Sequence, residues 1–152
     1  MADAPIRKIM LAFAALLAPL TATVYIDRTD DEPLDDAERP GIIPRVPHIA
    51  FENYQSQGMD LCRATFHFDC HSSGTSTETI DHQNQSTVTD ILAAIASDRT
   101  LGGRLQSCEA MAASGAAQDG ADIGCAILEV EVVFFTDRDN PYTIVGQAGA
   151  TF

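Results

Sequence analysis

The stretch TVTDILAAIASDRTLGG, residues 87–103, predicts a capped amphipathic helix that ends at a pair of glycines. Thr87 and Asp90 have the spacing of a capping box, in which two side chains satisfy amide donors of the first helical turn. Apolar residues then recur at helical spacing, and the closing glycines can adopt the left-handed backbone angles that end a helix. We therefore expect a central helix over residues 88–97, preceded by a flexible polar loop over residues 72–86.

Two long stretches of alternating polarity predict strands on either side of this helix. Residues 60–71 alternate between an apolar set and a polar set, as a strand with one buried face does. Residues 123–136 follow the same pattern, with Glu129 and Glu131 on the polar side. Three less regular segments are also expected to form strands: 21–26, 42–52 and 104–113.

The N-terminal segment fits either a signal peptide or an amphipathic helix. A basic pair precedes an apolar run, as in a signal peptide, but the residues near position 20 lack the small-x-small pattern of a cleavage site. Pro5 suits a first helical turn, and the apolar residues between 6 and 17 form one stripe. We favour the helix, and the run is too short and too interrupted by Pro19 for a membrane span.

Together these elements predict one α+β domain over residues 1–152. A mixed or antiparallel sheet of four to five strands would pack against the N-terminal helix and the central helix. After the last strand, Asn140-Pro141 and two glycines favour an extended C-terminal arm over residues 137–152, held by a neighbouring molecule. A chain of this length buries roughly 70% of its unfolded surface, so its core needs no disulfide or metal.

The formal net charge of −13 argues against binding to nucleic acid through phosphate contacts, which needs clustered Lys and Arg. Much of this charge lies in an acidic loop over residues 27–41. Its candidate functional residues are Asp30, Asp31, Glu32, Asp35, Asp36 and Glu38. The loop is either a solvated surface segment or an acidic rim past which DNA slides without adhering.

Four cysteines are too few and too scattered for a zinc site, and no CxxC pair occurs. Cys62 and Cys70 share the parity of the apolar face of the strand over residues 60–71, so we expect buried thiols. Disulfides remain the alternative if the compartment is oxidising.

The pattern His67-x-Asp69-x-His71 has the ligand types of a metal site but not the geometry. Residues four apart on a strand lie about 13 Å from each other, so the two histidines cannot reach one metal. We therefore predict no metal-binding residues.

Glu129 and Glu131 are not expected to form a catalytic acid–base pair, because Arg63 or His67 across the sheet would neutralise them. The chain also lacks a nucleophile elbow, a dinucleotide-binding loop and a P-loop. We predict no catalytic residues and no cofactor-binding residues, and we do not expect an enzyme.

The order of these features resembles the tail terminator proteins of long-tailed bacteriophages and gene transfer agents, the group of the minor tail protein U type. The resemblance covers most of the chain and begins with the N-terminal helix, its short strand and the acidic loop. The segments that carry it further are RPGIIP (39–44), the strand through 62–71, the helix end DRTLGG (98–103), the closing strand 125–135 and its exit TDRDNPY (136–142).

This resemblance implies a structural virion protein that assembles as a hexameric ring at the head-proximal end of the tail tube. The implied partners are other copies of the chain, the tail tube protein and a head–tail connector or stopper protein. DNA would pass through without specific binding, no membrane or cofactor would be involved, and the protein would assemble in the host cytoplasm and reside in the neck of the virion.

Within such a ring, the acidic loop would line the lumen or the rim. We expect subunit contacts on the polar strand faces and on the C-terminal arm, at Arg63, His67, Glu129, Glu131, Tyr142 and Phe152. Two alternatives remain open: another head–tail joining protein, such as a stopper or tail-completion protein, and a secreted binding module with disulfides.

Overall fold

The computed structural model describes residues 2–28, 34–54, 58–117 and 122–152. Its elements, in chain order, are α1 (Pro5–Leu17), β1 (Thr23–Val24), the short 3₁₀ helix η1 (Asp36–Glu38), β2 (Gly41–Tyr54), β3 (Met59–Ser73), α2 (Thr77–Ser97), β4 (Ser107–Ala117), β5 (Ile123–Asp137), β6 (Ile144–Val145) and η2 (Gln147–Gly149). This architecture confirms the predicted single-domain α+β fold.

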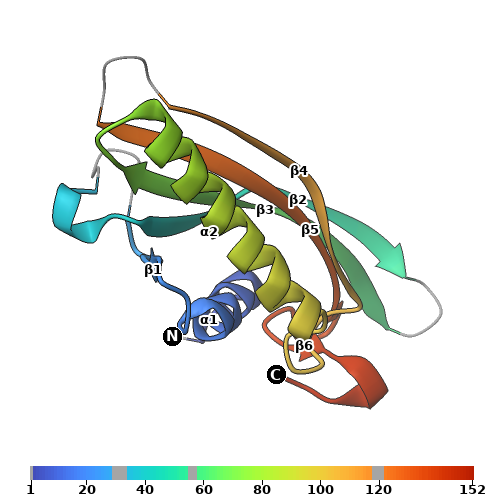
Figure 1. Ribbon diagram of the computed structural model, residues 1–152. Helices are drawn as coiled ribbons and strands as arrows, with labels where there is room; N and C mark the ends of the chain where they lie inside the picture. The colour runs from blue at the N-terminus through green and yellow to red at the C-terminus, as the bar shows by residue number, and fades with distance from the viewer. Residues whose placement is uncertain (1, 29–33, 55–57, 118–121) are drawn as a thin grey trace.

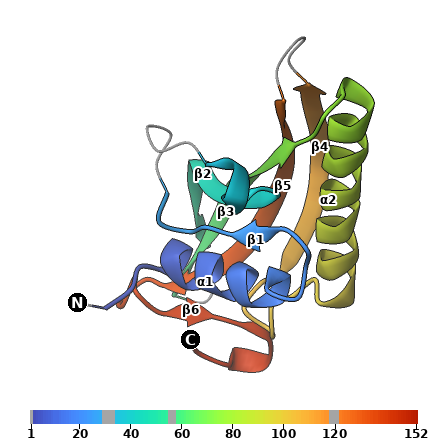
Figure 2. The same ribbon diagram turned by 60° about the vertical axis from the view of Figure 1, so that its left-hand side comes forward.

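The strands form one mixed sheet in the order β1-β2-β3-β5-β4, and β6 pairs with the end of β5. The four long strands are antiparallel to their neighbours, whereas the short β1 runs parallel to β2. The sheet is strongly twisted and curled, and α1 and α2 lie on the same side of it (Figures 1 and 2). We call this side the inner face and the opposite side the outer face.

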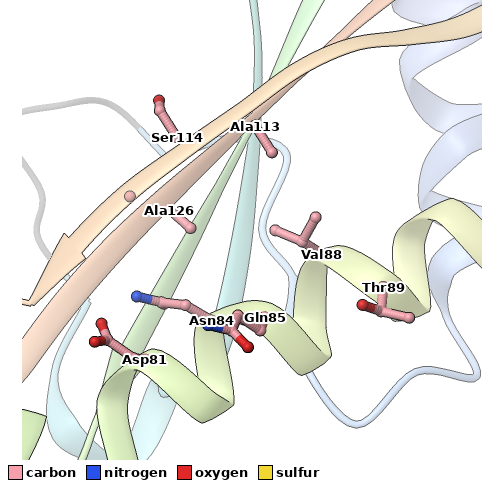
Figure 3. Close-up of a pocket in the computed structure, with 9 residues that line it drawn as sticks. Asp81, Asn84, Gln85, Val88, Thr89, Ala113, Ser114 and Ala126 are labelled. Atoms are coloured by element: carbon pink, nitrogen blue, oxygen red, sulfur yellow. The ribbon is translucent and has the colours of Figure 1, made fainter. Parts of the chain in front are cut away.

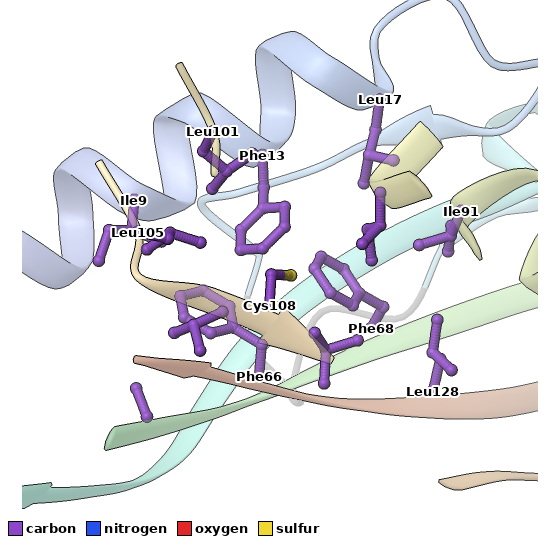
Figure 4. Packing of buried hydrophobic residues seen from close by; sticks show 14 of the residues in the cluster. Ile9, Phe13, Leu17, Phe66, Phe68, Ile91, Leu101, Leu105, Cys108 and Leu128 are labelled. Carbon is purple, nitrogen blue, oxygen red and sulfur yellow. The ribbon is translucent and has the colours of Figure 1, made fainter. Parts of the chain in front are cut away.

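The core lies between the inner face and the two helices (Figure 4). As the apolar stripe of α1 predicts, Ile9, Phe13 and Leu17 are fully buried. The Phe13 ring lies 5.1 Å from the ring of Phe66 and 5.2 Å from the ring of Phe68, both on β3. This aromatic cluster joins α1 to the centre of the sheet.

The start of α2 differs from the sequence prediction. The helix begins at Thr77, so most of the expected loop over residues 72–86 is helical. Ser76 is the N-cap, and its hydroxyl accepts a hydrogen bond from the backbone N–H of Thr79 at 3.2 Å. Thr87, the expected cap, is buried in the middle of the helix. The prediction failed because polar side chains occupy the inward stripe in the first half of the helix, which hides its apolar periodicity.

The end of α2 agrees with the prediction. The helix ends at Ser97, and a tight turn with positive φ angles follows at Leu101 (47°), Gly102 (67°) and Gly103 (88°). The Asp98 carboxylate accepts the backbone N–H of Gly102 at 2.8 Å and so closes this turn. β4 consequently begins three residues later than expected, at Ser107.

The C-terminal segment does not form the expected extended arm. It turns back along its own subunit, where β6 pairs with β5 and Phe152 exchanges backbone hydrogen bonds with Ile144 at 3.1 and 3.2 Å. The Lys8 ammonium group donates to the carbonyl oxygens of Tyr142 (2.7 Å) and Phe152 (2.9 Å). Because these contacts are intramolecular, no neighbouring molecule is needed to order the tail.

Replacing Phe152 by alanine is expected to lower the free energy of unfolding by about 1–3 kcal/mol. The Phe152 ring packs against the core, and the Arg104 guanidinium lies 4.5 Å from its centre. Urea denaturation followed by circular dichroism measures the loss. The exposed neighbour Thr151 provides the control, because Thr151→Ala should change stability little. Equal effects of the two substitutions would show that the tail does not dock as described.

Candidate assembly surfaces

The outer face brings together the four charged strand residues that the sequence singled out. Arg63 Nη1 lies 3.6 Å from Glu131 Oε1, and its Nε lies 3.4 Å from Glu52 Oε1. His67 Nε2 lies 3.3 Å from Glu129 Oε1. The glutamates are therefore paired with basic side chains across the sheet, as predicted, and such exposed pairs contribute little to stability.

One carboxylate of the outer face has an unfavourable neighbour within the chain. Glu109 on β4 lies directly opposite Glu131 on β5, and like charges in this arrangement destabilise a sheet. Glu109 was not among the predicted site residues, because the pairing of β4 with β5 cannot be inferred from a local sequence pattern. Glu109 is exposed and lies on the last strand of the sheet, where another molecule can reach it.

The three residues of the His67-x-Asp69-x-His71 pattern do not converge. Asp69 is buried and its Oδ2 accepts a hydrogen bond from Arg45 Nε at 2.6 Å. In the part of the chain that the structure describes, no three His, Cys, Asp or Glu side chains are grouped as metal binding requires.

The structure describes only part of the acidic loop: Asp30, Asp31 and Glu32 lie outside the described residues. Asp35 and Glu38 form a capping box on η1, with hydrogen bonds of 3.0 and 3.2 Å. Glu38 also pairs with Arg28. These two carboxylates have structural partners within the loop. Among the described residues of the loop, Asp36 is therefore the exposed candidate for a functional role.

The two aromatic candidates of the C-terminal segment differ in accessibility. The Tyr142 side chain is 50% exposed and stays a candidate for a subunit contact. The Phe152 ring is half-buried and packs against its own core, and its assignment to a subunit interface stays a prediction.

The sheet has two long open edges on opposite sides. The outer edge of β4 pairs with no strand in the described residues, and β1 covers β2 only at Gly41 and Ile42. The first half of β2 contains Pro44 and a register shift between Arg45 and His48, both of which hinder strand pairing. Its second half, from His48 onward, has no such protection.

Each open edge carries one strongly exposed apolar side chain. Phe51 on β2 is 72% exposed, and Met111 on β4, at a register shift between Ala110 and Ala112, is 60% exposed. Both values exceed those of every other large apolar side chain of the described residues. An apolar groove of about 480 Å³ lies beside Phe51, between the start of α1, the sheet and Tyr142. Exposed apolar residues on open edges are typical of surfaces that another molecule covers.

The four cysteines are free, and the fold does not allow any two of them to pair within one chain. Cys62 and Cys70 lie eight residues apart on one strand, which is about 26 Å, whereas a disulfide needs Cα atoms within about 7 Å. Cys108 lies two strands away from Cys62. Cys125 is close to Cys70 in register but points to the outer face, whereas Cys70 points to the core.

The buried thiols are expected to resist modification and to make the fold sensitive to alkali. Burial raises the pKa of Cys70 to about 12 and that of Cys108 to about 11. Their protonated forms are stable below pH 9 in both folded and unfolded chains. Above pH 9 these thiols ionise only in the unfolded chain. Each of them then lowers the free energy of unfolding by about 1.4 kcal/mol per pH unit, until the pH reaches the pKa of that thiol in the folded chain.

Urea denaturation between pH 8 and pH 11 tests this sensitivity on the wild type and on Cys70→Ala. The substitution should make the decline above pH 9 shallower, whatever its constant effect on stability. Parallel declines in the two proteins would contradict the burial of this thiol.

Sequence comparison finds no protein-family model that matches the chain, and no curated protein matches it either. Neither α1 nor α2, the two α-helices of the described residues, combines the length and apolar character that crossing a membrane requires.

Proposed function

We propose that this chain is the tail terminator of a phage-like particle. In this role copies of the chain close into a ring, for which we expect six subunits, at the head-proximal end of the tail tube. The ring ends tube polymerisation and joins the tail to the head connector. The single observation that carries the proposal furthest is the pair of open strand edges, each with an exposed apolar side chain.

The direction of the strands favours a ring over an open aggregate. The four long strands alternate in direction, so β2 and β4 run antiparallel to each other. When copies are related by rotation about an axis parallel to the strands, each strand keeps its direction. The β4 edge of one copy then meets the β2 edge of the next copy in antiparallel orientation. Contacts between two different patches of this kind close into rings when the rotation permits it.

The apolar side chains supply a driving force for this contact. Covering a side chain such as Phe51 or Met111 contributes about 1.5–3 kcal/mol. In a closed ring, each subunit contributes Phe51 to the contact on one side and Met111 to the contact on the other side. The polar outer face, with its paired charges, then remains available to water or to the ring lumen.

The acidic character of the chain suits a channel for DNA. A net charge of −13 repels phosphate, so DNA can move past without adhering. We place the acidic loop, represented in the described residues by Asp36, at the lumen or the rim. Unchanged DNA delivery after neutralisation of Asp30, Asp31, Glu32, Asp35 and Asp36 would contradict this placement.

The alternatives receive less support. A secreted module stabilised by its own disulfides does not fit four cysteines that cannot pair within the chain. A catalytic role lacks a grouped set of reactive side chains in the regions described above. The proposed partners are therefore the tail tube protein and a connector or stopper protein, in the neck of a virion assembled in the host cytoplasm.

Electron microscopy of growing tail tubes tests the proposal. Subunits of a phage-like tail tube are polymerised with and without the purified protein, and tube lengths are measured. We expect rings at one tube end and no further growth from that end. Tubes that elongate normally while rings bind only the head connector would indicate a stopper instead.

A further inference from the structure

A polar cleft of about 460 Å³ lies between the N-terminal half of α2 and the end of β4 (Figure 3). It is distant from the exposed Phe51. Register places Phe51 level with Phe134 on β5, whereas Gly115 in the cleft is level with Ala126. Eight residues of a strand separate these levels by about 26 Å. The cleft therefore lies near one end of the strands, away from the Phe51 end of the open β2 edge.

Small side chains on the inner face of β4 create the space. Ala113 and Ala126 point toward the helix across the cleft, and Val88 of α2 points back toward the strands (Figure 3). At Gly115 even a Cβ atom would lie 2.8 Å from the Cβ of Ala126. β4 and β5 thus approach each other closely at Gly115, and their small side chains leave the facing side of α2 uncovered.

Asn84 presents an unused hydrogen-bond donor at this cleft. The residue is only 5% exposed, and its Oδ1 accepts a hydrogen bond from Ser72 Oγ at 2.7 Å. Its Nδ2 has no partner within the part of the chain that the structure describes. An unsatisfied buried donor costs about 1–3 kcal/mol. The Nδ2 atom has almost no exposed surface, so an acceptor in the cleft recovers this cost only when the Asn84 side chain turns toward it.

Asp81 supplies a carboxylate that lacks a cation. It lines the cleft and is half-buried, and among the described residues it has no hydrogen bond or ion pair. The two walls contain no Lys or Arg: α2 carries Glu78, Asp81 and Asp90, and β4 carries Glu109. A basic side chain from outside therefore meets complementary charge and no competing cation.

We propose that this cleft binds an extended segment of a partner protein through a Lys or Arg side chain. The cation pairs with Asp81, a main-chain carbonyl of the segment accepts from Asn84 Nδ2, and the aliphatic part of the side chain lies against Val88 and Ala113. The identity of the partner rests on the proposed function: because the cleft lies near one end of the strands, the segment belongs to the protein that stacks on the ring.

A second copy of this chain is a poorer source of the cation. Of its nine Lys and Arg residues, eight already bind carboxylates or carbonyl oxygens of their own subunit: Arg7, Lys8, Arg28, Arg39, Arg45, Arg63, Arg104 and Arg138. The ninth, Arg99, is exposed and has no such partner among the described residues, so a second copy can supply the cation only through this one side chain.

The peptide acetyl-Thr-Val-Arg-Val-Thr-amide serves as the probe, and the same peptide with citrulline in place of arginine is its uncharged control. Binding is followed by nuclear magnetic resonance on the full chain, with the Asn84 side-chain amide as reporter. We expect saturable shifts for the arginine peptide, weaker binding at high salt, and at least about tenfold weaker binding of the citrulline peptide.

Matched variants locate the site. Asp81→Asn should weaken binding about tenfold, whereas Asp90→Asn, exposed on the same helix, should leave it unchanged. Ala113→Leu, which fills the cleft, should abolish binding. This second variant keeps the proposal testable if Asp81→Asn does not fold. Equal binding of both peptides, equal affinity of both aspartate variants, or no binding at all would overturn the proposal.

This test is separate from the test of the ring. Asp81→Asn should leave the oligomeric mass of the protein unchanged. If rings form and the peptide does not bind, the cleft proposal alone fails. If the peptide binds a protein that forms no rings, the proposed function fails and the cleft remains a binding site.

Discussion

Replacing Phe66 by alanine should lower the free energy of unfolding by about 3–5 kcal/mol. Phe66 is fully buried at the centre of β3, with the Phe13 ring at 5.1 Å and the Phe68 ring at 6.1 Å. Its removal leaves a cavity between α1 and the sheet that a close-packed core fills only in part. Urea denaturation of the purified variant measures the loss directly.

Phe51 provides the matched control for this substitution. It is also a strand phenylalanine, but 72% of it is exposed, so Phe51→Ala should leave the stability of the single subunit nearly unchanged. Comparable losses from both substitutions would contradict the burial of Phe66 and the exposure of Phe51.

Replacing Phe51 or Met111 by lysine should have the largest effect on assembly. Lysine on an open strand edge is a common means by which proteins prevent edge-to-edge pairing. It also removes the apolar burial of about 1.5–3 kcal/mol at every contact of the ring. We expect rings to dissociate into folded monomers at concentrations at which the wild type is assembled, as measured by analytical ultracentrifugation.

Leu11→Lys is the control for these edge variants. Leu11 is a similarly apolar, 38% exposed side chain, but it lies on α1 and not on a strand edge. This variant should assemble as the wild type does. Rings that survive both edge substitutions, with the subunits folded, would exclude the open edges as the contact surfaces.

Much of the fold could be predicted from the sequence because local patterns determine it. The alternation in β3 and β5 corresponds to their buried and exposed faces, and Pro5 together with the apolar stripe marks α1. The glycine pair marks the end of α2. In each case the residues that carry the signal lie within one element.

The errors arose where distant parts of the chain decide the structure. The first half of α2 places Asn84 and Thr87 on its inner side, so the apolar period is interrupted although the helix continues. The C-terminal segment folds back because Ile144 pairs with β5 and Lys8 binds its carbonyl oxygens. The Lys8 contacts join residues more than a hundred positions apart in the chain, which no local pattern reports.

The candidate sites show the same division. The charge pairs at Arg63 and His67 followed from strand parity, since cross-strand neighbours share a face. The open edges, with Phe51 and Met111, could not be found in this way, because the order of strands in a sheet is not a local property. The cleft at Asn84 was missed for a similar reason, because the helix around it was expected to be a loop.

The central claim is that this chain forms a ring that ends a tail tube, and the mass of the untagged protein tests it most directly. Native mass spectrometry is performed on the protein alone and after mixing with tail tubes. The account predicts a ring-sized oligomer, with six subunits expected, either in solution or only on tube ends. A stable monomer that ignores the tubes would contradict it.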